Sequence, residues 1–507
     1  MSEILDLSLR VLQFMAALFV LVIGLLVLTG LVLWVIDRTQ TRHSIRRNYP
    51  VIGRFRYVFE HLGEFFRQYF FAFDREELPF NRAQRSWVYR AAKNVDHTAA
   101  FGSTRDLRPE GTTIFLNCAF PRLDEESAPP AELTFGPDCR YPYTTDSFFN
   151  ISGMSYGALS KPAVQALSAG AAEAGIWLNT GEGGLSDWHL EGGCDLVFQI
   201  GTAKFGVRDA DGNLSEEALA RIASIERVRM FELKLAQGAK PGKGGILPKA
   251  KITDEIARIR MVSKDQDAIS PNRHREIANV EELLDMIGRI RSITGKPCGF
   301  KMVLGQADAL DDLCQAIHRR GPSSAPDFIT IDSGDGGTGA APMTLMDDVG
   351  LPLSEALPML VDKLNEYGLK SRIPVIASGK RINPVDVAWA LCAGADVVQA
   401  GRGFMFALGC IQAMQCNKNT CPTGVTTHDK HLQRGLVPED KAKRVAWYAR
   451  HMVREVSIIA HSCGVTRPRL LRREHARVVV SGGRSVLLSE LWPNRTPLEP
   501  YRDLADA

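Results

Sequence analysis

The stretch FITIDSGDGGTG, residues 328–339, shows how this chain of 507 residues is built. A short apolar run ends at a cluster of Gly, Ser and Asp, as a buried strand does where it reaches a loop. The same pattern recurs in FNISG (149–153), WLNTG (177–181), FELKLAQG (231–238), CGFKMVLG (298–305), PVIASG (374–379) and VVQAGRG (397–403). Helical stretches such as VEELLDMIGRIRSITG (280–295) and TDEIARIRMV (253–262) separate these runs, and this alternation predicts a parallel sheet. Seven or eight units in about 290 residues favour an α/β fold of the closed (β/α)₈ type, a TIM barrel, over an open doubly wound sheet.

The late apolar runs end in glycine-rich loops, where the active site of a barrel belongs. These loops are SGDGGTG (333–339), SGKR (378–381) and AGRG (400–403). Glycine lets backbone N–H groups turn toward an anion, so the set favours a cofactor that carries a phosphate. Each loop taken alone is better explained as a tight turn of the barrel. No GxGxxG follows the first strand, which disfavours a dinucleotide-binding Rossmann fold.

A further glycine-rich and basic loop, LAQGAKPGKGGILPK (235–249), lacks the GxxxxGK[ST] spacing of a nucleotide-binding loop. It could instead form a mobile wall over an anionic substrate. The nearby cations that could hold carboxylates, or stabilise negative charge on a ring, are Lys234, Lys240, Arg260 and Lys301. Taken singly, each of these residues is better explained as a solvated surface side chain.

Three cysteines lie close together in CIQAMQCNKNTC (410–421), in a chain that has ten. Their spacing does not fit one face of a helix, so an irregular loop must gather them. Gathered thiolates suit a soft metal, and three ligands indicate iron and sulfur more than structural zinc; buried structural thiols remain the alternative. The other cysteines show no repeating spacing, which disfavours a secreted disulfide framework and favours a reducing compartment.

The N-terminal region contains the longest apolar run. Residues 11–36 hold no charged side chain and, as a helix, exceed the roughly 20 residues needed to cross a bilayer. Arginine is frequent directly after the run, at Arg38, Arg42, Arg46 and Arg47. The positive-inside rule therefore predicts a single-pass anchor with the rest of the chain in the cytoplasm. No cleavage site of a signal peptide is evident, and a buried core helix is the remaining alternative.

The regions around the barrel are less regular. Residues 43–95 alternate aromatic and charged side chains, as in an amphipathic helix that lies on a membrane or packs on the main domain. A net charge of +3 gives no electrostatic footprint for nucleic acid.

The expected organisation is a tail (1–10), a transmembrane helix (11–36), a juxtamembrane helical and covering region (37–145), the barrel domain with its cysteine loop (146–435) and a C-terminal helical extension (436–507).

Five motifs, in this order, resemble the FMN-binding synthase domain of glutamate synthase: MSYGALS (154–160), NTGEGG (179–184), ELKLAQGAKPGKGG (232–245), GDGGTGAAP (334–342) and CIQAMQCNKNTCPTGV (410–425). The resemblance covers about residues 148–478. It implies a (β/α)₈ barrel that carries FMN and a [3Fe-4S] cluster, with Cys410, Cys416 and Cys421 as cluster ligands. The implied reaction is the reductive amination of 2-oxoglutarate, in which electrons pass from a donor through the cluster to FMN and a hydride then reaches 2-iminoglutarate.

The same resemblance implies roles for individual residues. Lys301 is expected near the N1/C2 carbonyl side of the flavin, and Glu182 near the point where ammonia arrives. The residues expected to contact FMN are Met154, Ser155, Tyr156, Lys301, Gly336, Gly337, Thr338, Gly339, Gly379, Lys380, Gly401 and Arg402. The residues expected to hold the keto acid are Lys234, Lys240 and Arg260.

The chain departs from the family pattern at several points. A membrane helix stands where the family has its glutaminase domain, which predicts that ammonia or an amine comes from another source. The family sequence KPGEGGQLPG reads KPGKGGILPK, so that Ile246 replaces a substrate-contacting glutamine and Lys243 replaces a glutamate. The stretch ISPNRHREIAN (269–279) alters a second substrate-side loop. An apolar side chain cannot make the hydrogen bond of the lost amide, and this favours a changed substrate.

The leading hypothesis is a membrane-anchored, glutamate synthase-like flavoprotein oxidoreductase that acts on CH–NH₂ donors. Its substrates would be a 2-oxo acid with ammonia or an amine, and its electrons would come from a ferredoxin-type or membrane-bound partner. One alternative is a membrane FMN and iron–sulfur oxidoreductase on an unrelated substrate, which Ile246 favours. Another is a noncatalytic electron-transfer subunit of a complex, which would cycle its cofactors without turning over a small molecule.

Overall fold

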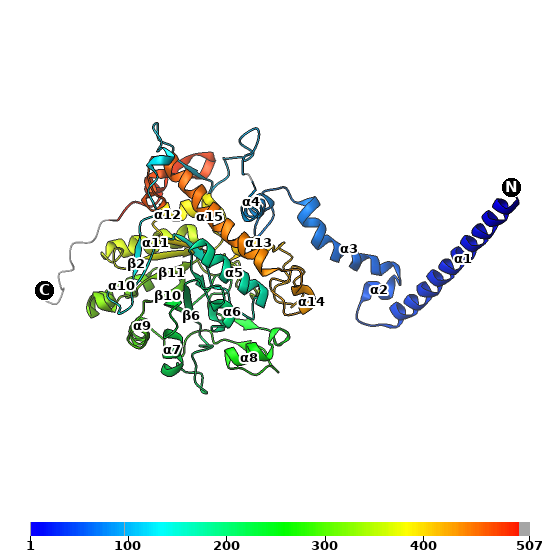
Figure 1. The fold of residues 1–507 in the computed structure, drawn as a ribbon, viewed down its shortest axis with the longest axis horizontal. Helices are drawn as coiled ribbons and strands as arrows, with labels where there is room; N and C mark the ends of the chain where they lie inside the picture. The colour runs from blue at the N-terminus through cyan, green and yellow to red at the C-terminus, as the bar shows by residue number, and fades with distance from the viewer. Residues whose placement is uncertain (1, 96, 496–507) are drawn as a thin grey trace. The chain divides into compact units, whose positions relative to one another are not determined.

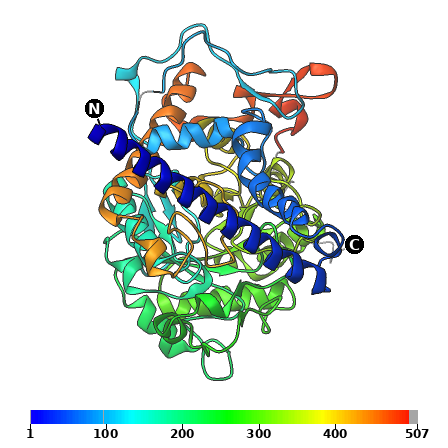
Figure 2. The ribbon, with the colours of Figure 1, turned by 90° about the vertical axis from the view of Figure 1, so that its right-hand side faces the viewer.

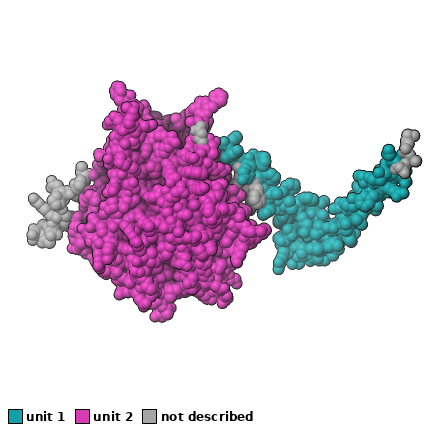
Figure 3. All heavy atoms as spheres, viewed as in Figure 1, with its two compact units in different colours: residues 1–83 teal, residues 84–507 magenta. Residues whose placement is uncertain are grey.

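The computed structural model describes residues 2–95 and 97–495. The chain forms two compact units, residues 1–83 and residues 84–507, which are coloured separately in Figure 3. The first unit contains helices only, and the second contains every strand among the described residues.

Eight parallel strands close into a barrel in the second unit. They are β4 (Phe149–Ile151), β5 (Leu178–Asn179), β6 (Leu196–Ile200), β7 (Val228–Lys234), β10 (Cys298–Val303), β11 (Ile329–Asp332), β12 (Val375–Ser378) and β13 (Val397–Ala400). The last strand pairs with the first, Ala400 opposite Ile151, and this closes the barrel. The predicted (β/α)₈ barrel is confirmed.

Helices cover the outside of the barrel (Figure 1). They are α5 (Lys161–Ala174), α6 (Asp187–Leu190), α7 (Glu216–Ala223), α9 (Val280–Thr294), α10 (Asp308–Arg320), α11 (Leu353–Glu366), α12 (Pro384–Cys392) and α13 (Arg402–Leu408). Local sequence sets their ends. The side chain of Asn279 accepts a hydrogen bond from the Glu282 N–H at the start of α9, and Gly295 ends that helix with a φ of 66°.

One barrel strand, β6, is absent from the apolar runs that predicted the fold. The helix before it, α6, has only four residues. The alternation of strands and long helices is therefore interrupted at this point, and the sequence pattern loses its period. The stretch 253–262 differs in another way, because α8 (Asp254–Arg260) lies between β8 (Ile246–Leu247) and β9 (Ala268–Ile269), a two-stranded antiparallel insertion after β7.

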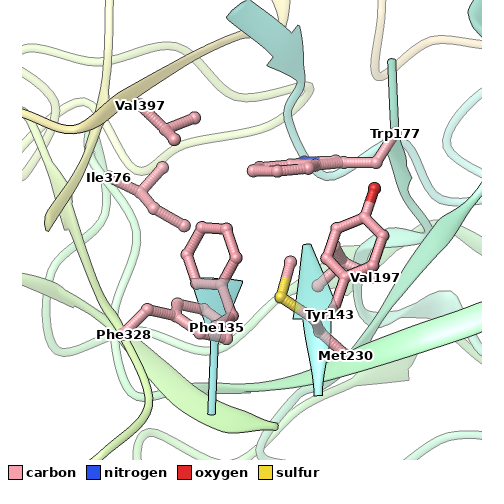
Figure 4. Packing of buried hydrophobic residues seen from close by; sticks show 8 residues of the cluster. All are labelled: Phe135, Tyr143, Trp177, Val197, Met230, Phe328, Ile376 and Val397. Atoms are coloured by element: carbon pink, nitrogen blue, oxygen red, sulfur yellow. The ribbon is translucent and has the colours of Figure 1, made fainter. Parts of the chain in front are cut away.

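A hairpin of β2 (Leu133–Phe135) and β3 (Tyr143–Thr145) supplies aromatic side chains to the core. Phe135 and Tyr143 pack into a buried cluster (Figure 4), whose other members are Trp177, Val197, Met230, Phe328, Ile376 and Val397. These partners all lie at or near the beginnings of barrel strands. The hairpin thus closes the amino-terminal end of the barrel with apolar contacts, and the polar loops occupy the opposite end.

The chain beyond the barrel is only partly helical. After α14 (Lys430–Gln433), the long helix α15 (Pro438–Ser462) packs along α5. A small antiparallel sheet then joins β14 (Ala476–Val479) to β15 (Ser485–Leu487) and to β1 (Thr113–Phe115), and α16 (Leu488–Leu491) follows. The expected helical extension at 436–507 therefore needs correction, since three- and four-residue strands give too short a pattern to recognise.

The first unit begins with α1 (Ser2–Thr39), one continuous helix in Figures 1 and 2. Within Ile4–Thr39, an 18-residue window has a mean hydropathy of 3.0 and none of it is buried by the protein, so the helix is long and apolar enough to cross a membrane. This exposure disfavours a buried core helix. A signal sequence would meet the same criteria of length and composition.

The helix α1 is joined to the helices after it by a buried carboxylate. Asp37 is fully buried and accepts hydrogen bonds from Arg54 at 2.7 and 2.8 Å and from the Val51 N–H at 3.0 Å. Arg54 belongs to α3 (Ile52–Phe66), which follows α2 (Ser44–Asn48) and precedes the π-helical turn Arg67–Phe71; α4 (Arg82–Ala92) comes next. The exposed apolar side chains of α3 are Ile52, Phe55, Val58, Phe59, Leu62 and Phe66.

Candidate active site

A single cavity at the carboxyl ends of the barrel strands collects most of the residues named from the sequence. Those that line it are Met154, Ser155, Glu182, Lys234, Lys240, Arg260, Lys301, Gly337, Thr338, Gly339, Gly379, Lys380, Gly401, Arg402 and Cys416. They come from loops after different strands, and only the closure of the barrel brings them together.

Four of the named residues do not line this cavity: Tyr156, Gly336, Cys410 and Cys421. The hydroxyl of Tyr156 donates to Glu255 at 2.5 Å, while its carbonyl accepts from Arg260 Nη2 at 3.1 Å. Tyr156 therefore contributes to the cavity through its main-chain carbonyl, which holds the cavity-lining side chain of Arg260. Gly336 forms the turn after β11, where its N–H donates to the Ser333 carbonyl.

A buried ion pair lies on the cavity wall. Lys301 Nζ on β10 is 3.2 Å from Asp332 Oδ2 at the end of β11, and both side chains are about nine-tenths buried or more. The second contact of Asp332 Oδ2 is the Gly238 N–H, at 2.9 Å. This aspartate orients the ammonium group. The sequence analysis missed Asp332, although a carboxylate on the last residue of a barrel strand is a signal that could have identified it.

The basic side of the cavity surrounds one carboxylate. Lys234 Nζ lies 2.9 Å from Glu182 Oε1 and donates to Gln237 Oε1 at 2.7 Å. Burial alone would raise the pKa of Glu182, but Lys234 and Lys240 bring it down to about 2. Burial, with the charge of Lys234, lowers the pKa of Lys240 to about 8. Glu182 is thus an anion at neutral pH, and Lys240 loses its proton at a lower pH than an ordinary lysine.

A second buried carboxylate, missed by the sequence analysis, organises the floor of the cavity. Glu232 on β7 is fully buried and accepts hydrogen bonds from Asn179 at 2.8 Å, Gln199 at 2.7 Å and Thr330 at 2.6 Å. Gln199 also lines the cavity. Satisfied polar networks of this kind fix side-chain positions, so the floor is rigid.

One corner of the cavity, formed by residues 333–339, 378–381 and 400–402, suits a phosphate group. Gly379 has a φ of 111°, and a Cβ atom there would lie 2.5 Å from the Ser333 Cβ. A Cβ atom on Gly339 would meet nothing within 4 Å, so that glycine faces open space. Lys380, Arg381 and Arg402 add cations to the same corner. Accessible backbone N–H groups together with cations are what phosphate oxygens require.

The three cysteines lie on an irregular loop between α13 and α14, as their spacing predicts. Three non-glycine residues of this loop have positive φ angles: Gln412 (59°), Met414 (51°) and Asn419 (60°). Such conformations cost about 1–3 kcal/mol each and persist where the surroundings impose them. Neighbouring contacts hold the loop, since Tyr89 donates to the Cys410 carbonyl at 2.7 Å and Lys251 to the Cys416 carbonyl at 3.3 Å.

The cysteine sulfurs are surrounded by hydrogen-bond donors. The Gln412 N–H lies 3.4 Å from Cys410 Sγ, Arg402 Nη1 lies 3.8 Å from Cys416 Sγ, and Thr423 Oγ1 lies 3.5 Å from Cys421 Sγ. Donors around sulfur are typical of ligated thiolates.

Comparison with known proteins identifies the family of this chain. Residues 123–466 match the family described as the conserved region in glutamate synthase. The chain belongs to this family. It is 40% identical over 482 residues to the glutamate synthase large subunit-like protein YerD of Bacillus subtilis, a match that covers 87% of this chain and 91% of YerD.

Other members of the glutamate synthase family match over a shorter part. The archaeal glutamate synthase [NADPH] of Methanocaldococcus jannaschii is 34% identical over 335 residues, which is 66% of this chain and 62% of that one. The archaeal-type enzyme of Thermotoga maritima is 33% identical over 63% of this chain and 60% of its own length. This chain thus spans less than two thirds of these relatives.

Among solved structures, a mandelate oxidase with bound (S)-4-hydroxymandelic acid has a TM-score of 0.47 at 15% identity, covering 78% of this chain and 99% of that one. The flavin-binding domain of baker's yeast flavocytochrome b2 has a TM-score of 0.45 at 12% identity, covering 89% and 93%. Neither likeness bears on function.

Proposed function

We propose that the protein is a membrane-anchored glutamate synthase that uses FMN and a [3Fe-4S] cluster to aminate 2-oxoglutarate or a related 2-oxo acid reductively. The observation that carries this proposal is the composition of the cavity. One space joins a cationic wall, a glycine-lined corner and Cys416 of the cysteine loop. The family and the resemblance of its motifs support the same reaction.

The residues present fit both groups. Gly337, Gly379, Lys380 and Arg402 would hold the phosphate of FMN, and Met154 and Ser155 would line the ring. Cys410, Cys416 and Cys421 would hold the cluster. When bound, FMN supplies a hydride and the cluster supplies electrons. Lys301, held by Asp332, would stabilise negative charge on the ring by its fixed ammonium group.

The 2-oxo acid would bind through its carboxylates to Lys240 and Arg260. Lys240 makes no side-chain hydrogen bond or ion pair among the described residues, so its ammonium group is available to a ligand. Arg260 is buried, and its Nε has no hydrogen-bond partner in the same part of the chain. A carboxylate that reaches both cations would satisfy these donors.

Glu182 would serve the nitrogen source. Its low pKa keeps it ionised at neutral pH, so it accepts hydrogen bonds and cannot donate a proton. A carboxylate of this kind attracts an ammonium ion. Lys234 holds it in place at 2.9 Å.

One observation favours a second candidate, an oxidoreductase that acts on a different substrate. Ile246 lines the cavity beside Gly245 and Leu247, where the resemblance leads us to expect a glutamine. An apolar wall favours a substrate with an apolar side chain over one with a second carboxylate. A site that hydrogen-bonds a polar group rejects an analogue lacking it by about 10⁴-fold, whereas an apolar contact discriminates far less.

The apolar helix α1 supports a membrane anchor, with the cationic residues after it on the cytoplasmic side. The Asp37–Arg54 contact ties α3 to the end of α1, which supports a position of α3 close to the membrane surface. The exposed aromatic side chains of α3 support the same position, because they are typical of interfacial helices. An electron donor, of the ferredoxin type or bound to the membrane, would approach the cysteine loop. Met414, which is 67% exposed, marks its outer side.

Full-length protein in detergent, with FMN and iron–sulfur cluster reconstituted, tests the proposal. With a chemical electron donor, ammonium and a panel of 2-oxo acids, we expect amino acid formation that Lys240→Gln lowers at least tenfold by raising KM. Lys249→Gln is the matched control, because Lys249 lies in the same region but does not line the cavity. No amino acid product from any 2-oxo acid, with both cofactors intact, would refute the proposal.

A further inference from the structure

A second cluster of ligand-type side chains lies away from the cavity, on the outside of the barrel. His451 and Glu455 are four residues apart on α15 and so share one face of that helix. His97 reaches them from the segment after α4. Each of the three offers one ligand atom, and these atoms all lie within 4.8 Å of one another.

The two imidazoles and the carboxylate converge. His97 Nδ1 is 3.9 Å from Glu455 Oε1. The rings of His97 and His451 lie 4.8 Å apart at an interplanar angle of 77°, so they meet edge to face. Ligand atoms on one tetrahedral ion lie about 3.4 Å apart, which follows from bond lengths of 2.0–2.2 Å. A closing movement of up to about 1.4 Å would therefore be enough to form a site.

The environment of His451 prepares one ring nitrogen for a ligand. Its Nε2 lies 2.8 Å from Asn94 Oδ1, an oxygen that can only accept, so Nε2 carries the proton. The lone pair is then on Nδ1, which is buried and has no hydrogen-bond partner among the described residues. A hydrogen bond that fixes the tautomer from behind is typical of metal-bound histidine.

The ring of His97 is also held in place. Trp87 on α4 stacks against it, with ring centroids 5.6 Å apart and planes 23° apart. Trp87 in turn contacts Tyr448 on α15. This aromatic packing gives the cluster an apolar wall.

We propose that His97, His451 and Glu455 form a binding site for a divalent transition-metal ion of the zinc class. Imidazole and carboxylate together suit zinc and its neighbours in the first transition series more than Ca²⁺ or Mg²⁺. Three protein ligands leave one coordination position for water. None of the three residues lines the cavity, so the site is separate from the proposed reaction.

The bound ion would tie the segment around His97 to α15. The neighbouring helix α4 also contacts the cysteine loop through Tyr89, whose hydroxyl donates to the Cys410 carbonyl. The metal would thus stabilise the packing of α4 between α15 and that loop, as a structural site does. Metal binding is expected to raise the midpoint of thermal unfolding.

The test uses full-length protein with its cofactors loaded, so that the three cysteines of the loop are occupied. Zn²⁺ is titrated by calorimetry, and Co²⁺ is added separately to record its absorption spectrum. We expect about one equivalent of Zn²⁺ to bind and the cobalt spectrum to lack thiolate charge-transfer bands. His451→Gln and Glu455→Gln should each weaken binding at least ~100-fold, because loss even of an outer partner costs 10–100-fold.

Two further variants keep the outcome clear. Asn94→Ala leaves all three ligands in place and should weaken binding about 10- to 100-fold through the tautomer alone. His461→Gln is the matched control, since it lies on the same helix near Asp124 and outside the cluster. Absence of Zn²⁺ binding by the unmodified protein, or equal binding by all of these variants, would overturn the proposal.

Discussion

Replacing Gly379 with alanine tests the phosphate corner of the cavity. Gly379 has a φ of 111°, and a Cβ atom there would lie 2.5 Å from the Ser333 Cβ and 3.1 Å from its backbone nitrogen. Carbon atoms that are not bonded prefer about 3.5–4.0 Å, so Ser333 must move by about 1 Å. That movement strains the Ser333 N–H to Ser378 hydrogen bond and the one from the Leu353 N–H to Ser333 Oγ.

The free-energy cost of Gly379→Ala has two causes. An L-residue in this backbone region costs about 1–3 kcal/mol, and overpacking costs about 1–3 kcal/mol more. If the free protein relaxes by moving residues 378–381, FMN binding must restore them. A total strain of about 2–6 kcal/mol then appears as an FMN Kd about 30- to 20,000-fold weaker. If the loop does not relax, the same strain appears as lower stability toward urea.

Gly368→Ala is the matched control. Gly368 also has a positive φ, 65°, but a Cβ atom there would meet nothing within 4 Å. It should cost only about 1–2 kcal/mol of stability and leave FMN binding unchanged. FMN affinity is measured by flavin fluorescence on reconstitution of apoprotein, and stability by urea unfolding. A Gly379→Ala protein that binds FMN normally and unfolds like the control would refute the assignment of this corner.

Four other outcomes follow from the same structure. Ile246→Gln should raise kcat/KM for 2-oxoglutarate relative to apolar 2-oxo acids about tenfold, measured by competition, and an unchanged ratio would show that Ile246 does not select the substrate. Cys416→Ser should lower iron per protein while leaving FMN content intact, and equal iron content would exclude this ligand. Because the pKa of Lys240 is about 8 and the protonated form binds carboxylate, KM for the 2-oxo acid should rise about tenfold per unit above pH 8, and Lys240→Arg should move this rise to higher pH. Arg54→Ala leaves the buried Asp37 without its partner, so proteolysis within residues 40–60 should become faster in detergent, and an unchanged rate would contradict a structural role for the contact.

The barrel could be predicted because each strand ends at, or is followed within two residues by, glycine or a polar residue, and most strands are followed by a full helix. The prediction missed β6, where the preceding helix is too short to continue the pattern, and the sheet of β1, β14 and β15. In that sheet Thr113 pairs with Val478, far along the chain. Three residues of local sequence contain no information about such a distant partner.

The candidate site, like the fold, was predicted only in part from the sequence. The motif residues were found by their local spacing and resemblance, and the cavity brings fifteen of them together. Asp332, Glu232 and Gln199 were missed, because each acts through contacts between different barrel strands, and these contacts form only in the folded sheet. The ligand cluster of His97, His451 and Glu455 was missed for a related reason, since its histidines belong to segments more than 300 residues apart in sequence.

A single-turnover experiment with ¹⁵N-ammonium tests the central claim most directly. The full-length protein is reduced without oxygen until the flavin absorbance is bleached, and 2-oxoglutarate and labelled ammonium are then added. The account predicts rapid return of the flavin absorbance with one labelled glutamate formed for each flavin reoxidised. A flavin that stays reduced, or one that reoxidises without labelled glutamate, would contradict it.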